Sequence, residues 1–224
     1  MRAAHASSRN VETTDARAYV VGLLGRGIQQ SRTPAMHEGE GAAQGLPYVY
    51  RLLDADAMGD PPPSLAELLR FAEYFGFCGL NVTYPYKQEI LPLLDELSDN
   101  ARQVGAVNTV VLRNGRRRGH NTDVWGFAES FRRGMADAKR DEVLVLGAGG
   151  AGAAVAHALL DSSVGRLAIF DVDGGRAEAL AVRLGARFGK DRAVPVRDLA
   201  HAAKSADGIV NATPVGMDKL PNCP

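Results

Sequence analysis

The chain has 224 residues, of which 46% are hydrophobic and 23% charged, so it can bury a core as one large or two small globular domains. Its 26 Lys and Arg residues balance its 26 Asp and Glu residues. This balance gives no electrostatic reason to expect binding to nucleic acid or to an anionic membrane. No apolar run approaches the roughly 18 residues of a transmembrane helix, and two cysteines make no disulfide framework, so we expect a cytoplasmic protein.

The first part of the chain predicts a polar tail followed by alternating strands and helices. Residues 1–18 lack the apolar core of a signal peptide and predict a flexible tail. Thr33 is a plausible N-cap for a helix with Pro34 near its first position. Cys78 lies in an apolar run and is expected to be a small core residue. Strands are expected at 19–24, 48–53, 78–82 and 106–113, with helices at 34–44 and 64–74.

The Arg116-Arg117-Arg118 run is the one basic cluster, and a solvated hairpin or loop explains it better than a binding patch. A connecting helix is then predicted at residues 123–140, and from residue 142 strands and helices alternate in a pattern that indicates a parallel sheet. The predicted fold class is therefore α/β, with an N-terminal α/β domain at 19–122 and a Rossmann-type doubly wound sheet at 141–224. Its strands are expected at 143–146, 167–170, 193–196 and 208–211, and its helices at 150–160, 175–184 and 199–204.

A glycine-rich turn joins the strand at 143–146 to the next helix, which is the context that the G-x-G-x-x-G pattern requires. Gly147 permits a tight turn, Gly149 lets the backbone approach a pyrophosphate, and Gly152 allows close packing of helix on strand. Gly150 and Ala151 open the helix, whose first N–H groups can bind phosphate. Dinucleotide binding explains this turn better than a glycine-rich packing turn does, because both flanking elements are present.

Several polar side chains, one of them an amine, lie near the ends of predicted strands in the first half of the chain. Asn81, Thr83 and Lys87 lie at the end of one predicted strand or shortly after it, and Asn108 lies in another. Amides and hydroxyls supply the donors and acceptors that the hydroxyls of a polyhydroxylated small molecule require. Each of these residues could instead cap a turn. That alternative explains a single residue as well as binding does, but it explains the whole set less well.

Five segments of the chain, in order, carry recognisable motifs. They are GRGIQQSRTPAMH at 25–37, GLNVTYPYKQEI at 79–90 with LLDELSDNARQVGAVNT at 93–109, GHNTDVWGF at 119–127, the glycine turn at 147–152 and NATPVGM at 211–217. Together they resemble the shikimate/quinate dehydrogenase family. The resemblance implies reversible hydride transfer at a ring hydroxyl of shikimate or quinate, giving the 3-dehydro acid. It also implies a hydroxylated cyclohexane or cyclohexene carboxylate as substrate, and a monomer or homodimer.

By this resemblance, Lys87 and Asp123 stand at the positions of the family's catalytic dyad, in a substrate-binding catalytic domain. On its own, a lone lysine would be a solvated surface charge, and Asp123 could equally be the N-cap of the helix that it starts. The Ser31-x-Thr33 spacing resembles the quinate/shikimate branch, which tends to use NAD. The residues implied to bind substrate hydroxyls and carboxylate are Ser31, Thr33, Thr83, Asn108 and Asn121. His37 and His120 are not accompanied by other residues in a metal-binding pattern, and no metal is expected.

The residue that follows the second strand of the Rossmann unit indicates NAD. Asp171 lies 22 residues after Gly149, where an acidic residue accepts hydrogen bonds from the adenosine ribose. NADP-using members of the family typically have an Asn-Arg-Thr turn there, whereas this chain has Asp171-Val172-Asp173, so NADP is disfavoured. Arg176 could still reach a 2′-phosphate, and Asp173 could simply cap the next helix. The resemblance adds Asn211, Thr213 and Pro214 as cofactor contacts.

Family members continue beyond the NATPVGM segment through further Rossmann strands and a C-terminal helix, so the Rossmann domain is expected to be C-terminally incomplete. An incomplete sheet would leave an unpaired edge at 208–211, and we expect self-association through residues 208–224. The alternative to an active NAD-dependent enzyme is a catalytically impaired NAD-binding remnant.

Overall fold

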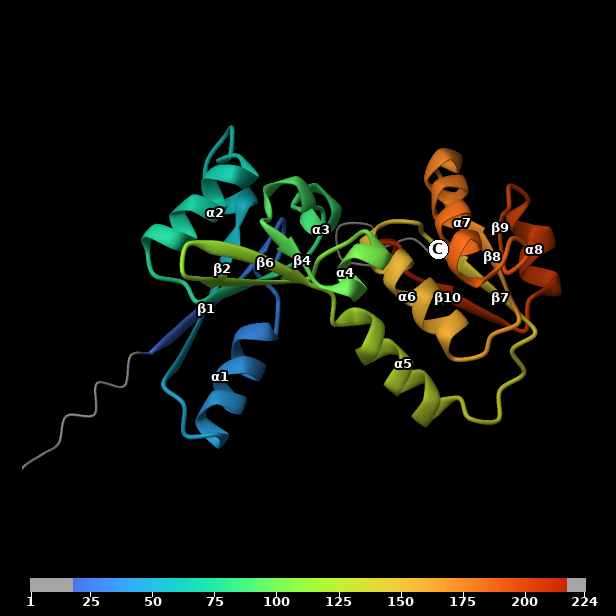
Figure 1. Cartoon of the computed structure of the whole chain (residues 1–224), viewed down its shortest axis with the longest axis horizontal. Coiled ribbons are helices and arrows are strands. Elements are labelled where there is room, and N and C mark those ends of the chain that lie inside the picture. The colour runs from blue at the N-terminus through green and yellow to red at the C-terminus, as the bar shows by residue number, and fades with distance from the viewer. Residues whose placement is uncertain (1–17, 217–224) are drawn as a thin grey trace, which may run out of the picture.

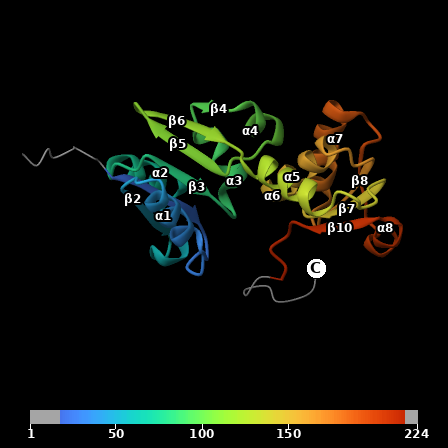
Figure 2. The ribbon, with the colours of Figure 1, turned by 90° about the horizontal axis from the view of Figure 1, so that it is seen from below.

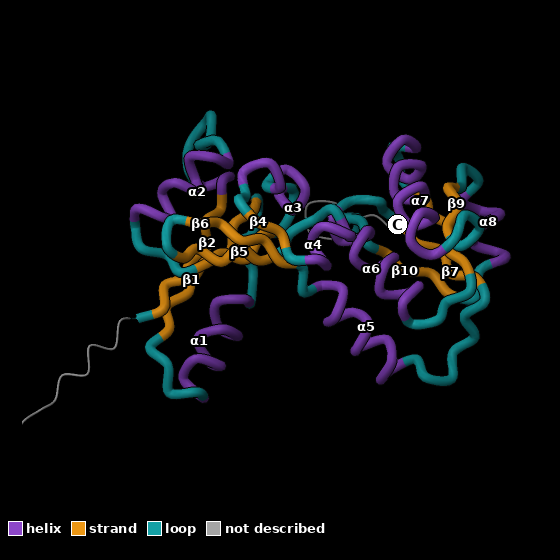
Figure 3. Tube along the Cα trace, viewed as in Figure 1, coloured by secondary structure: helices purple, strands orange, loops and turns teal. Residues whose placement is uncertain are grey.

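The computed structural model describes residues 18–216, and it contains two α/β halves joined by one helix (Figure 1). The six-stranded half and the four-stranded half each contain one sheet with helices packed on it (Figure 3). Within residues 18–216, no helix combines the length and apolarity needed to cross a membrane. Residues 1–17 of the predicted tail, the second cysteine, Cys223, and the part of the predicted self-association segment beyond residue 216 lie outside the described residues.

The six-stranded half has a mixed sheet in the order β2-β1-β3-β5-β6-β4. β1 pairs in parallel with β2 and β3, whereas β5 runs antiparallel to β3 and β6. Because β1, β2 and β3 are parallel, their carboxyl ends meet at one edge of the sheet. The strands are β1 (Tyr19–Gly25), β2 (Tyr48–Asp54), β3 (Gly79–Val82), β4 (Glu96–Leu97), β5 (Thr109–Arg113) and β6 (Arg116–His120).

Helices cover both faces of this sheet, with α1 on one side and α2 and α3 on the other (Figure 1). The main core lies on the α2 face, where Leu68 and Leu69 pack with Leu80 and Val110. α2 starts at a capping box formed by Ser64 and a glutamate at its third position. The helices are α1 (Thr33–Ala43), η1 (Ala55–Ala57), α2 (Leu65–Tyr74), α3 (Tyr86–Glu89), η2 (Leu91–Leu93) and α4 (Asp99–Val104).

The three-arginine run lies in a β-hairpin, as expected. Asn114 and Gly115 both have positive φ, 53° and 69°, which is the geometry of a tight hairpin turn between β5 and β6. Arg117 forms two hydrogen bonds with Glu73 at 2.6 and 2.7 Å. Arg116 and Arg118 both pair with one glutamate of β4. The strand predicted at 106–113 begins later, at Thr109, and the sequence gave no signal for the two-residue strand β4 that pairs with β6.

The prediction that Cys78 is a core residue is wrong, because its side chain is exposed. Its backbone joins the sheet on both sides, accepting from Leu112 N and donating to Val20 O. The position lies before β3 begins, so the apolar run correctly indicated a strand but did not indicate where the core ends. Thr33 is also not the N-cap of α1: Arg32 occupies that position and makes no side-chain cap.

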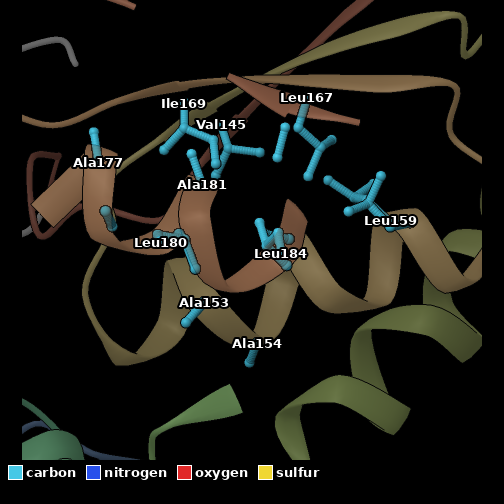
Figure 4. Packing of buried hydrophobic residues seen from close by; sticks show 14 of the residues in the cluster. Val145, Ala153, Ala154, Leu159, Leu167, Ile169, Ala177, Leu180, Ala181 and Leu184 are labelled. Carbon is cyan, nitrogen blue, oxygen red and sulfur yellow. The ribbon is translucent and has the colours of Figure 1, made fainter. Parts of the chain in front are cut away.

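The four-stranded half has an entirely parallel sheet in the order β10-β7-β8-β9, with β10 at an edge among the described residues. Figure 4 shows Leu180 and Leu184 of α7 and Leu159 of α6 packed beside Leu167 and Ile169 of the sheet. A smaller cluster beneath α8 covers the other face. The elements are β7 (Glu142–Leu146), α6 (Gly150–Asp161), β8 (Arg166–Phe170), α7 (Gly174–Phe188), β9 (Ala193–Pro195), α8 (Leu199–Ser205) and β10 (Gly208–Asn211).

The connecting helix α5 (Asp123–Gly134) ends six residues before the predicted end at residue 140, and Met135 is its C-cap. It lies alongside α6 (Figure 2), and its Phe127 and Phe131 pack against the core of the four-stranded half. Val104 and Ala106 of the six-stranded half belong to that same core. The two halves therefore share apolar packing at the seam formed by α4, α5 and α6.

Candidate active site

The loop after β1 lies at the sheet edge where β1, β2 and β3 end. A side chain at Gly25 would come within 2.4 Å of Thr83 Cγ2, so the loop lies directly against Thr83. Arg26 N also donates to the carbonyl of Tyr84 at 3.0 Å. Ser31 Oγ and Thr33 Oγ1 are 2.6 Å apart in the same loop, and Thr33 N donates to Ser31 Oγ at 3.2 Å. The structure thus brings together the hydroxyls of Ser31 and Thr33, two side chains that are predicted to bind substrate.

Asp54, at the end of β2, holds this loop in place. It was not among the site residues predicted from the sequence. Its buried carboxylate accepts hydrogen bonds from Gly27 N at 2.8 Å, Ile28 N at 3.0 Å and Gln29 Nε2 at 3.0 Å. Burial alone would raise the pKa of this carboxyl, but hydrogen bonds from Gln29, Gly27, Asp56 and Ile28 outweigh burial and lower it. An acidic residue closing the apolar strand YVYRLLD was the signal available in the sequence.

Lys87 and Asp123 meet although they are 36 residues apart. Lys87 Nζ donates to Asp123 Oδ2 at 2.6 Å, and the two side chains are 18% and 33% exposed, so the pair is sheltered but accessible. Asp123 is the first residue of α5, and Thr122 holds the N-cap position. The alternative that Asp123 caps its own helix is therefore wrong, and its carboxylate is available for Lys87.

Two asparagines fix the turn that carries Asp123. Asn108 Nδ2 donates to Asp123 Oδ1 and to Thr122 Oγ1, each at 2.8 Å. Asn121 is 4% exposed, and its Oδ1 accepts from the backbone N–H groups of Asp123 and Val124, at 3.1 and 3.3 Å. Asn121 therefore satisfies the first N–H groups of α5, which its N-cap residue leaves without a side-chain partner.

The glycine turn has the shape that a dinucleotide requires. Gly147 has φ of 94°, and a side chain at Gly152 would come 1.9 Å from the carbonyl oxygen of Gly147. Next to Gly149 there is no atom within 4 Å of such a side chain, so the turn is open there. A helix N-terminus above an open glycine turn suits a pyrophosphate, so these residues fit the cofactor that the motif implies.

Gly150 brings the glycine turn against the ion pair. A side chain at Gly150 would lie 2.8 Å from Cβ of Lys87 and 3.3 Å from Cβ of Ala106. The first turn of α6 thus packs directly on the stem of Lys87, and only glycine allows this approach. The sequence gave no sign of this contact, because the two motifs lie in different halves of the chain.

The predicted ribose residue lies beside the same turn. Asp171 Oδ2 accepts from Ala148 N at 2.6 Å, and Oδ1 accepts from Asp173 N at 2.9 Å. Asp173 caps α7 by accepting from Gly175 N at 3.0 Å, which confirms the capping alternative for this residue. Arg176 Nε lies 3.5 Å from Asp173 Oδ2, and both side chains are largely exposed.

The loop after β10 packs against the glycine turn. A side chain at Gly147 would come 3.0 Å from Thr213 Cγ2, so this loop and the glycine turn are in contact. Asn211 Oδ1 accepts from Thr213 N at 2.9 Å and from Thr213 Oγ1 at 2.6 Å, and Asn211 Nδ2 donates to Val215 O at 3.0 Å. Pro214 lies within the loop that these hydrogen bonds hold.

Within residues 18–216 there is no cluster of three or more His, Cys, Asp or Glu side chains that could hold a metal ion. His37 stacks on Tyr50 with ring centroids 4.6 Å apart. Burial, followed by the positive charge of Arg118, lowers the pKa of His120.

Comparison with known proteins identifies related sequences along the described chain. One family model, the shikimate dehydrogenase substrate binding domain, matches residues 23–110, and a second, shikimate / quinate 5-dehydrogenase, matches residues 129–216. A shikimate dehydrogenase (NADP(+)) from Streptomyces avermitilis is 51% identical over 92% of this chain and 72% of its own length. A quinate/shikimate dehydrogenase (NAD(+)) from Corynebacterium glutamicum is 49% identical over 91% of this chain and 73% of its own length.

Solved structures agree with these sequence matches. The quinate dehydrogenase from Corynebacterium glutamicum in complex with NAD superimposes with a TM-score of 0.82 at 48% identity, covering 92% of this chain and 74% of that one. Neither the relatives nor the solved structures support the alternative of a catalytically impaired remnant. The order of the motifs, the two matching family models and the shared fold lead to one conclusion: the chain belongs to the shikimate/quinate dehydrogenase family.

Proposed function

We propose that the protein catalyses the reversible oxidation of quinate and shikimate at a ring hydroxyl, with NAD as the preferred electron acceptor. The observation that carries this proposal is the contact between two motifs. The Lys87–Asp123 pair lies against Gly150, the first residue of the helix that follows the dinucleotide turn. A dehydrogenase that oxidises an alcohol needs a proton acceptor next to a turn that binds the pyrophosphate of the dinucleotide, and here the two are in direct contact.

In this proposal Lys87 and Asp123 are the catalytic residues. Oxidation removes a proton from the substrate hydroxyl and a hydride from the carbon that bears it. Lys87 Nζ, as the neutral amine, takes the proton and becomes an ammonium ion, which the carboxylate of Asp123 stabilises at 2.6 Å. In the reverse direction Lys87 returns that proton to the alkoxide. A bound nicotinamide supplies the acceptor for the hydride.

The substrate is held, in this proposal, by hydroxyls and amides of the six-stranded half. Ring hydroxyls need both donors and acceptors, and the carboxylate needs donors. The paired hydroxyls lie in the loop that begins at Gly25, where the chain contacts Thr83, and the asparagines border the turn that carries Asp123. The binding residues are Ser31, Thr33, Thr83, Asn108 and Asn121.

The preference for NAD rests on charge at the far end of the cofactor site. Asp171 and Asp173 place two carboxylates where a 2′-phosphate of NADP would lie, and repulsion disfavours that phosphate. Arg176 is engaged by Asp173 at 3.5 Å, which reduces its ability to neutralise a phosphate. We propose that Gly147, Gly149, Gly150, Ala151 and Gly152 hold the pyrophosphate, and that Asn211, Thr213 and Pro214 border the cofactor.

We assign the substrate-binding catalytic domain to residues 19–122, the connecting segment, which is α5 and the turn after it, to 123–140, and the NAD-binding domain to 141–224. The assignment rests on the two separate sheets and on the helix α5 between them. The substrate is a small hydroxylated ring carboxylate, and the protein acts as a monomer or homodimer.

Initial rates with quinate and shikimate, each with NAD and NADP, test this proposal. We expect turnover of both acids and a kcat/KM at least about tenfold higher with NAD, which corresponds to 1.4 kcal/mol. Equal kcat/KM values for the two cofactors would contradict the NAD preference and would point to Arg176 as a phosphate partner. Binding of NAD without turnover of either acid would contradict the activity itself.

A further inference from the structure

A chain of side-chain hydrogen bonds crosses the six-stranded sheet and ends at the Lys87–Asp123 pair. Tyr50 of β2 reaches over β1 to Asn81 of β3, with its hydroxyl 2.7 Å from Asn81 Oδ1. Asn81 Nδ2 lies 3.3 Å from the hydroxyl of Thr109, its register partner on β5. None of these contacts was visible in the sequence, because they join strands that are far apart along the chain.

The chain continues from Thr109 to the ion pair. Thr109 Oγ1 donates to Asn108 Oδ1 at 3.1 Å, and Asn108 Nδ2 donates to Asp123 Oδ1 at 2.8 Å. Asn108 is thereby held at both ends of its amide. Its second Nδ2 contact and its second Oδ1 contact go to Thr122, the residue before Asp123.

All the donors in this chain point the same way. Tyr50 donates to Asn81, Asn81 to Thr109, Thr109 to Asn108, and Asn108 to Asp123. Hydrogen bonds aligned in one direction polarise one another, so each donor becomes stronger than it would be alone. The last acceptor is a carboxylate, which is the group that gains most from a strengthened donor.

Tyr50 is a suitable fixed start for the chain. It is 2% exposed, and its ring stacks on His37 of α1 at 4.6 Å between centroids. Burial, followed by the charge of Tyr48, raises the pKa of the Tyr50 hydroxyl well above its ordinary value, so it remains a donor throughout the physiological pH range. The orientation of Asn81 is then determined, because only its Oδ1 can accept from this hydroxyl.

We propose that Tyr50 and Thr109 are positioning residues for the Lys87–Asp123 pair, which they orient through Asn81 and Asn108. The inference rests on the proposed dehydrogenase activity. Neither residue need touch the substrate or the cofactor. Together with the N–H of Thr122, which also donates to Asn108 Oδ1 at 3.0 Å, their hydroxyls keep the amide of Asn108 turned with its nitrogen toward Asp123. They thereby keep the carboxylate in the geometry that stabilises the ammonium form of Lys87.

The sharpest test replaces Thr109, whose hydroxyl is the central link. Thr109→Val keeps the shape of the side chain and removes both hydrogen bonds, whereas Thr109→Ser keeps the hydroxyl. Tyr50→Phe removes the first donor and serves if Thr109→Val fails to fold. Tyr48→Phe is the matched control: Tyr48 is on the same strand and also faces His37, and no hydrogen bond of its hydroxyl occurs within residues 18–216.

We expect Thr109→Val to lower kcat with quinate and NAD roughly three- to tenfold, the effect of one or two lost hydrogen bonds, with KM for both reactants within about twofold. A quinate deuterated at the reacting carbon should show a larger isotope effect on kcat in this variant, because the chemical step has become slower. Thr109→Ser should recover most of the lost rate, Tyr50→Phe should resemble Thr109→Val, and Tyr48→Phe should leave kcat unchanged.

The proposal is overturned if Thr109→Val changes only KM, if its isotope effect stays at the wild-type value, or if Tyr48→Phe lowers kcat as much as Tyr50→Phe does. Failure of the proposed function looks different, because the wild-type protein would then bind NAD and turn over neither acid. The two failures are therefore distinguished by the wild-type rate alone.

Discussion

The two halves of the molecule build their parts of the site in different ways. The four-stranded half uses backbone: six consecutive residues form an open turn, and its key positions are glycines whose missing side chains make room. The six-stranded half uses side chains from strands β2, β3 and β5, from helices α1 and α3 and from loops, and hydrogen bonds join residues far apart in the chain, including Asp123 of α5. Substitutions should therefore separate substrate chemistry from cofactor binding. The predictions for Lys87, Gly152 and Asp54 test that separation, and the prediction for His157 tests the seam that joins the two halves.

Lys87→Ala should have the largest effect. Loss of the proton acceptor is expected to lower kcat by roughly 10²–10⁴, the usual contribution of a general base, while calorimetric titration shows NAD binding unchanged. Lys204→Ala, on an exposed position of α8, is the control and should keep the wild-type rate. A wild-type kcat in Lys87→Ala would remove Lys87 from the catalytic site.

The seam between the halves should be sensitive to acid because of His157 on α6, which is 2% exposed. Burial, followed by the charge of Arg187, lowers its pKa to about 4. Above pH 6.5 the residue is neutral in the folded and unfolded states. Between pH 6.5 and 4 the unfolded chain takes up a proton that the folded protein resists, so the free energy of unfolding should fall by about 3 kcal/mol.

Urea denaturation at several pH values measures this loss, and His157→Leu serves as the matched variant. Because leucine does not titrate, the variant should lose about 3 kcal/mol less than the wild type over the same pH interval. Parallel pH dependences in the two proteins would show that other groups govern the acid sensitivity.

Gly152→Ala should damage the cofactor half. The added carbon would lie 1.9 Å from the carbonyl oxygen of Gly147, so the turn must shift. We expect a loss of roughly 1–3 kcal/mol in stability, as for overpacked sites, and weaker binding of NAD, with KM for quinate little changed. Gly126→Ala is the control, since outside the adjacent residues and the backbone of α5 no atom lies within 4 Å of the new side chain, and alanine favours the helix. If both variants bind NAD equally well, close packing at Gly152 is not required.

Asp54→Asn should act on the substrate half alone. The amide keeps the size of the carboxylate, but it loses the charge and the second acceptor oxygen that hold the loop after β1. We expect KM for quinate to rise about tenfold, equivalent to 1.4 kcal/mol, with NAD binding intact. Asp191→Asn, on an exposed residue of the other half, is the control. An effect on NAD binding equal to that on quinate would remove the distinction between the halves.

The difference between the halves also explains what could be predicted from sequence. The glycine turn is local, so its strand, its helix and the roles of Gly147 and Gly152 follow from consecutive residues. The α/β class and most element positions follow from hydrophobic periodicity. The hydrogen-bond chain from Tyr50 to Asp123 could not be predicted, because it depends on the strand order β2-β1-β3-β5. Asp54 was missed for a similar reason, since its partners lie in a loop 25 to 27 residues earlier.

The boundary of the buried core also could not be predicted from the sequence. Cys78 continues an apolar run and was expected to be buried, yet it lies directly before β3 and is exposed. Arg32, not Thr33, precedes the first turn of α1, which frees the Thr33 hydroxyl to pair with Ser31.

The central claim is that the chain oxidises a ring hydroxyl by transferring hydride to NAD beside Lys87. The most direct measurement uses quinate deuterated at the reacting carbon, with mass spectrometry of the reduced cofactor and of the acid product. We predict a deuterium in the reduced cofactor for each molecule of the 3-dehydro acid formed, and no deuterium transfer by Lys87→Ala above background. NAD binding with no deuterium transfer in the wild-type protein would contradict the account.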